Sequence, residues 1–92
     1  MIGAKYNRLT EAGNIKASDG LLYWLIIHND DGDPRYVVLN DAISGTGSEV
    51  AKFKVAAKRT EVFNFNPPII LNTGIRIGTF EESAMEVTGG YD

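Results

Sequence analysis

The sequence predicts an all-β fold in the form of one antiparallel sandwich or barrel of about eight short strands. Three observations support this. Apolar, β-branched runs recur about every ten residues along the chain. Clusters of Gly, Asn, Asp, Ser and Pro separate the runs, and several runs alternate polar with apolar residues. Units of the βαβ type would need helical stretches between the strands, which this pattern does not offer.

Length and composition favour a single domain without covalent cross-links. The chain has 92 residues, of which 43% are hydrophobic, and it contains no cysteine. Disulfides, thiolate metal ligands and a cysteine nucleophile are therefore excluded. A chain of this size buries only about 60 to 65% of its unfolded surface, so neighbouring subunits would add useful stability. We expect residues 13–92 to form the sandwich and residues 1–12 to form an N-terminal arm or an edge strand.

The charge balance bears on which partners are expected. The formal net charge is −3 and the pI is near 5.0. Binding to a nucleic-acid backbone depends on clustered Lys and Arg, so it is not expected here. The N-terminus shows no secretory signal pattern, and no apolar run reaches the roughly 20 residues needed to cross a bilayer. We expect a protein made in a cytoplasm that needs no membrane.

The most apolar stretch of the chain is Gly20–Asn29, which holds the single Trp and the single His. A turn-forming stretch, residues 30–34, separates it from a second apolar run at residues 35–39. Two such runs joined by a loop containing Asp-Gly predict a β-hairpin, with Gly32 supplying a positive φ. We therefore expect these two runs to form the central hairpin of the domain.

The segment 49–59 is compatible with either a strand or a helix. As a strand, it places Phe53 and Val55 on one side and Lys52 and Lys54 on the other. As a helix, it offers Ser48 as an N-cap and several good helix formers. We favour the strand, because the neighbouring segments are strand-like and a lone short helix is costly to nucleate.

The remaining strands follow from local patterns. Residues 14–17 alternate, and residues 40–48 form a polar loop. A strand is expected at residues 61–65 and should end at Asn66-Pro-Pro68, because proline cannot donate to a ladder. Further strands are expected near residues 69–71, 75–77 and 84–88, with Tyr91 as a last inward residue.

No pattern of residues indicates a catalytic or metal site. His28 lacks a second His, a Cys or a recognisable motif nearby, so we assign it no function. The acidic loop 29–33 resembles a calcium loop only superficially, since Ile27 and Val38 occupy positions where an EF-hand needs ligands. We expect a turn there, and no cofactor.

Two further groups also favour structural roles. The loop 45–47 is glycine-rich but lacks the Gly-Lys-Ser/Thr pattern of a phosphate-binding loop. Glu81 and Glu82 are consecutive and would face opposite sides of a strand, so they are not placed as a catalytic pair.

Surface contacts are the remaining place to seek function. Tyr23 and Trp24 are adjacent, so on a strand only one of them should line the core. The other would be covered by another subunit, stack on a sugar or a base, or stay partly exposed. Lys52 and Lys54, with neighbouring Lys58 and Arg59, would form a solvated face or contact an acidic partner.

The order of motifs resembles small virion structural proteins of tailed bacteriophages. The run Gly20–Asn29 is followed by Tyr36-Val-Val-Leu-Asn-Asp41 and Gly45-Thr-Gly47, then by Pro68-Ile-Ile-Leu-Asn-Thr-Gly-Ile-Arg-Ile77 and Ala84-Met-Glu-Val-Thr88. The likeness covers residues 18–92, and its motifs are short. The chain departs from the pattern at Gly89-Gly90, which lengthen the final strand, and in its Lys-rich segment. The resemblance implies a jelly-roll-like β-sandwich without an active site that decorates or cements heads, or belongs to a tail or fibre.

These observations predict a non-enzymatic virion protein, assembled in the host cytoplasm, that stabilises a capsid through many weak contacts. Its partners would be the major capsid protein or other virion proteins, together with further copies of itself. The predicted contact residues are Ile2, Tyr6, Leu9, Tyr23, Trp24, Lys52 and Lys54. The alternatives are a carbohydrate- or receptor-binding module of a tail or fibre, and an OB-like single-strand binder, which the acidic balance disfavours.

Overall fold

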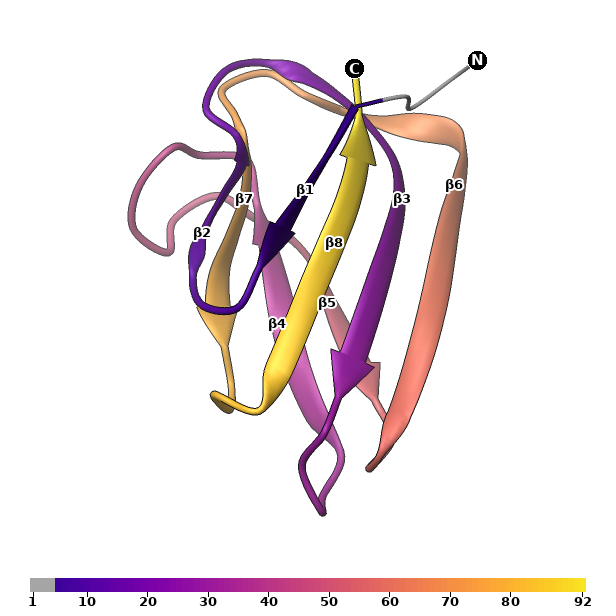
Figure 1. Ribbon diagram of the computed structural model, residues 1–92. Coiled ribbons are helices and arrows are strands. Elements are labelled where there is room, and N and C mark those ends of the chain that lie inside the picture. The colour runs from indigo at the N-terminus through magenta and orange to yellow at the C-terminus, as the bar shows by residue number, and fades with distance from the viewer. Residues whose placement is uncertain (1–4) are drawn as a thin grey trace.

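The computed structural model describes residues 5–92 and shows two packed four-stranded sheets (Figure 1). The described residues form strands, turns and loops, without a helix. The strands are β1 (Lys5–Leu9), β2 (Gly13–Lys16), β3 (Gly20–Asn29), β4 (Arg35–Asn40), β5 (Glu49–Val55), β6 (Arg59–Leu71), β7 (Ile75–Phe80) and β8 (Met85–Tyr91). The predicted all-β sandwich is confirmed.

The strand order is that of a jelly roll. One sheet has the order β1-β8-β3-β6 and the other the order β2-β7-β4-β5, and all pairs are antiparallel. Strand β4 pairs with β5, β3 with β6, β2 with β7 and β1 with β8. The chain thus resembles one long hairpin, with its tip at the loop after β4, wound into two layers.

The predicted central hairpin is wrong, because β3 and β4 lie in different sheets. Residues 30–34 carry the chain across the sandwich, and the true hairpin is β4–β5. Positive φ angles occur at Gly45 (70°), Ser48 (55°) and Lys58 (58°), and not at Gly32. Turn-forming residues signal that the chain reverses, but they do not determine which sheet it enters next.

The strand predicted for segment 49–59 is confirmed over Glu49–Val55, and residues 56–58 form the turn that leads into β6. Val55 is fully buried, and Phe53 packs against Phe63 of β6 with ring centroids 5.0 Å apart. Phe53 also contacts Phe65, at 5.9 Å. These rings join the edges of the two sheets, and this tertiary contact favours the extended form over a helix.

The prediction that Asn66-Pro-Pro68 ends a strand is wrong, because β6 continues to Leu71 in the same sheet. Its register with β3 passes from Trp24↔Asn64 to Leu22↔Ile69. Residues 65–68 therefore bulge opposite Tyr23 alone. The bulge accommodates two prolines that a regular ladder could not hold, and pairing resumes beyond it.

This irregularity also changes the faces of β3. The side chains in the core are Leu22, Leu25 and Ile27, and neither Tyr23 nor Trp24 belongs to the buried core. The expectation that one of the two lines the core is wrong, because the register shift between Leu22 and Trp24 interrupts the simple alternation.

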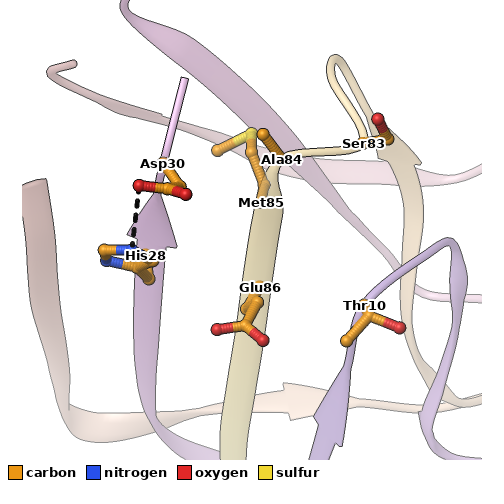
Figure 2. A pocket seen from close by; sticks show the side chains of 7 residues that line it. All are labelled: Thr10, His28, Asp30, Ser83, Ala84, Met85 and Glu86. Atoms are coloured by element: carbon orange, nitrogen blue, oxygen red, sulfur yellow. Dashed lines mark ion pairs between the residues drawn. The ribbon is translucent and has the colours of Figure 1, made fainter. Parts of the chain in front are cut away.

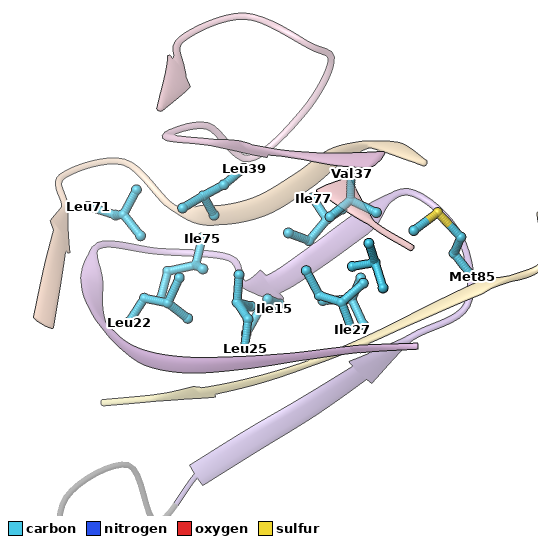
Figure 3. Packing of buried hydrophobic residues seen from close by; sticks show 12 residues of the cluster. Ile15, Leu22, Leu25, Ile27, Val37, Leu39, Leu71, Ile75, Ile77 and Met85 are labelled. Atoms are coloured by element: carbon cyan, nitrogen blue, oxygen red, sulfur yellow. The ribbon is translucent and has the colours of Figure 1, made fainter. Parts of the chain in front are cut away.

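The core lies between the inner faces of the two sheets (Figure 3). Its buried members are aliphatic: Ile15, Leu22, Leu25, Ile27, Val37, Leu39, Val55, Leu71, Ile75, Ile77, Met85 and Val87. Gly89 of β8 lies beneath Ile15 of β2, and a Cβ at position 89 would come within 2.5 Å of Ile15 Cδ1. A glycine is therefore needed for Ile15 to reach this depth.

Two asparagines are also buried, at the ends of β3 and β4. The Asn29 amide donates to the carbonyl oxygens of Asp33, Val55 and Ala56. The Asn40 amide donates to the carbonyl oxygens in the loop after β4, and its oxygen accepts from β7. Each side chain ties the loop that follows its strand to the sandwich, so its burial is fully compensated.

Candidate functional site

The outer face of the β1-β8-β3-β6 sheet carries several exposed apolar side chains. Residues paired across antiparallel strands share a face. One row across the sheet is Tyr6, Gly90, Trp24 and Asn64, and the next is Arg8, Thr88, Ile26 and Val62. Tyr6 is 67% exposed, Val62 57% and Ile26 37%. Aromatic and aliphatic side chains thus meet on one side of the sheet, facing away from the core.

Trp24 occupies the middle of this face. Its indole lies over Gly90 of β8, where even a Cβ atom would overlap the ring. The glycine therefore lets the ring lie across the neighbouring strand and half-buries it. Gly90 therefore has a clear structural role, because it makes room for the only Trp of the sequence.

The apolar surface continues beyond the bulge of β6. Ile70 is 70% exposed and pairs with Leu21 of β3. Its neighbours Ile69 and Leu71 both pack on the core, so alternation directs Ile70 outward.

The polar border of the face is electrically balanced. Arg8 of β1 and Glu86 of β8 form an ion pair across the two strands. His28 and Thr60 form the adjacent row, with 2.7 Å between Nδ1 and Oγ1. No unpaired charge therefore interrupts the apolar rows described above.

The residues predicted as contacts fall into separate places. Tyr6 and Trp24 come together on the outer face, and Tyr23 lies at the β6 bulge, half-buried. Leu9 packs partly buried against the core. Ile2 lies outside the described residues. The sequence reasoning missed Ile26 and Val62, although both share a strand face with residues of the Trp24 row and could have been found by alternation.

Lys52 and Lys54 belong to the opposite side of the sandwich. Both are exposed on β5, at the edge of the β2-β7-β4-β5 sheet. The Lys52 ammonium lies 4.8 Å from the ring centroid of Tyr36, a cation–π contact that covers this aromatic ring. These lysines and the Trp24 surface cannot contact one flat partner together.

A hollow of about 330 Å³ adjoins the apolar face at the end where His28 and Glu86 lie (Figure 2). It is lined by Thr10, His28, Asp30, Ser83, Ala84, Met85 and Glu86. His28 Nε2 lies 4.0 Å from Asp30 Oδ1, while Lys58 Nζ lies 3.4 Å from the same oxygen. Hydroxyl, imidazole and carboxylate groups thus line one hollow, but the imidazole–carboxylate distance exceeds the about 2.6 to 3.2 Å of a catalytic hydrogen bond.

A second hollow of about 370 Å³ shares Thr10 and Ser83 with the first. Its other lining residues are Glu11, Ala12, Gly78, Thr79 and Phe80. Within residues 5–92, no three His, Cys, Asp or Glu side chains are grouped closely enough to hold a metal ion. The described chain also contains no helix long and apolar enough to cross a membrane.

Two loop carboxylates prove to be structural. The backbone N–H groups of Thr73, Asn72 and Gly74 donate to Asp41 and lower its pKa, against a smaller opposing effect of burial. The pKa of Asp31 is lowered chiefly by its hydrogen bond from Arg35, at 2.8 Å. Both carboxylates are thus held ionised and hold loops in place.

Comparison of the chain with protein-family models, with curated proteins and with solved structures returned no match.

Proposed function

We propose that this protein is a non-enzymatic structural component of a tailed-bacteriophage virion, with decoration or cementing of the capsid as its role. The observation that carries the proposal is the apolar outer face built from Tyr6, Trp24, Ile26 and Val62. Contiguous apolar surface of this kind marks a site of protein association. The resemblance of residues 18–92 to small phage virion proteins is the reason for proposing a virion as the assembly in which this face is used.

The mechanism is multivalent binding. Each copy presents a rigid sandwich and buries a modest surface in the particle. Contacts made by copies that are already held in one assembly act at a high effective concentration, so weak individual contacts add up to a stable coat. Repeated across a shell, they would raise the temperature at which the capsid opens.

Binding to purified capsids tests this proposal. The full chain is mixed with particles that lack decoration, from the phage that encodes it, and bound protein is measured by co-sedimentation. We expect saturable binding at a fixed number of copies per capsid subunit, and a higher melting temperature of the coated particles. An absence of binding at saturating concentrations would contradict the proposal.

Point variants are better than truncation for locating the contacts. Removal of residues 1–10 would delete strand β1, which pairs with β8 along Lys5–Leu9, and would damage the sheet itself. Lys52→Glu with Lys54→Glu reverses charge on the opposite outer face instead. Reduced occupancy in this double variant would place the shell contact on β5.

A second candidate function is carbohydrate binding, which one observation favours. Tyr6 and the Trp24 indole lie in one row, with the amide of Asn64 beside them. Aromatic rings of this kind stack on the apolar face of a sugar. Glycan-array binding that is lost in Trp24→Ala would support this role, and an array without signal would count against it. The OB-like alternative is disfavoured, because an OB fold is a five-stranded barrel, whereas residues 5–92 form eight strands in two sheets.

A further inference from the structure

We infer that the outer face of the β1-β8-β3-β6 sheet is covered by a second copy of this chain, so that two sandwiches pair face to face about a two-fold axis. The inference rests on the proposed function only in treating this face as an assembly surface. It names the occupant of the face, and therefore the unit that would be delivered to a particle.

The size of the face suits such a pair. The molecule is a slab with extents of 34 × 29 × 18 Å, so its two sheet faces are its broadest surfaces. The four strands of this sheet lie about 4.8 Å apart and range from about 17 Å (β1) to about 44 Å (β6) in length, which gives a projected area of about 550 Å². Protruding side chains such as Tyr6 and Val62 make the accessible area larger, close to the about 800 Å² that each partner buries in a standard interface.

The charge distribution suits a second copy better than a charged partner. At the outward positions assigned above, the oppositely charged side chains are Arg8 and Glu86, and they pair with each other. The net charge of −3 must therefore arise elsewhere on the chain. Two such faces can approach without repulsion between like charges, and apolar surface meets apolar surface. A strongly basic or acidic partner would find no complement in these rows.

The strand edges favour pairing through the face over pairing through an edge. Edge strand β6 contains Pro67 and Pro68 at its bulge, and prolines lack the N–H that sheet extension needs. Edge strand β5 carries Lys52 and Lys54, and edge strand β2 spans only Gly13–Lys16. Three of the four edge strands are thus protected against the addition of another strand, whereas no comparable feature keeps another molecule from the outer face.

Sedimentation equilibrium of the full chain tests this inference. We expect wild-type protein at about 100 μM to have the mass of two chains. Val62→Glu should raise the dimer dissociation constant by about 100-fold or more, because symmetry buries the unpaired charge twice. Val62 is already 57% exposed, so the substitution leaves the sandwich folded, and circular dichroism verifies this. Ile26→Glu, nearer the middle of the face, should have at least the same effect.

A matched control lies on the other sheet. Val50 of β5 is 44% exposed, so Val50→Glu adds the same charge to a similarly exposed valine and should leave the dimer intact. A monomeric wild type overturns the inference, as does a Val62→Glu protein that dimerises as well as wild type. A monomer that still coats capsids would overturn the pairing and keep the proposed function. A dimer that binds no capsid would support the pairing and contradict the proposed function.

Discussion

Replacing Asn40 by alanine is expected to lower the free energy of unfolding by about 2 to 5 kcal/mol. The Asn40 side chain is fully buried at the end of β4. Its amide donates to the carbonyl oxygens of Thr46 at 2.9 Å and Gly47 at 3.0 Å, and its oxygen accepts from the buried Gly78 N–H at 3.0 Å. Two hydrogen bonds that water can replace cost about 0.5 to 1 kcal/mol each, and a buried N–H left without a partner costs about 1 to 3 kcal/mol.

Asn40→Asp is the isosteric companion and adds a signature in pH. One carboxyl oxygen keeps the bond from Gly78, but the other faces two carbonyl oxygens, so the charged form is disfavoured and the pKa of the new carboxyl is raised. Its neutral form can donate to one of these carbonyls. Stability is therefore retained below the ordinary carboxyl pKa and lost as the pH rises through the raised one.

Urea unfolding, followed by circular dichroism at pH 4 and pH 7, measures both effects against wild type at each pH. We expect Asn40→Asp to be closer to wild type at pH 4 than at pH 7. A loss below about 0.5 kcal/mol for Asn40→Ala, typical of a neutral surface substitution, would refute the reasoning. The reasoning would also be refuted if the free energy of unfolding of Asn40→Asp were closer to that of wild type at pH 7 than at pH 4.

The remaining predictions concern a loop carboxylate, Asp41, and the glycine beneath the tryptophan ring, Gly90. Because the pKa of Asp41 is lowered from 3.8 in the folded protein, its contribution to stability is present above that value and is lost as the pH falls through the folded pKa. Asp41→Asn should therefore have a lower free energy of unfolding than wild type at pH 7. In urea titrations, this difference between the two proteins should become smaller as the pH is lowered towards 2. A difference that does not change with pH would contradict this prediction. Gly90→Ala should displace the Trp24 ring, shift its fluorescence and lower the free energy of unfolding by about 1 to 3 kcal/mol. Gly32→Ala is its control, because nothing lies within 4 Å of a Cβ at position 32, and an equal shift in both variants would count against the packing argument.

The candidate surface could be predicted only in part from local sequence patterns. Trp24 and Tyr6 were both expected to make contacts, yet their meeting on one face depends on β1 and β3 both pairing with β8. Ile26 and Val62 complete the surface only through the β3–β6 register. Alternation within a strand indicates which side chains share a side, but it does not say which strands lie next to each other.

Local patterns were sufficient to predict the all-β class, a strand within residues 49–59 and the polar loop after β4, because period-two alternation and turn residues act over a few neighbouring positions. They did not reveal that β3 and β4 enter different sheets, that β6 continues past its prolines or that Trp24 lies outside the core over Gly90. Those outcomes depend on contacts between residues far apart in the chain. A strand with one apolar side can be buried by either sheet, and the packing of the whole sandwich selects which.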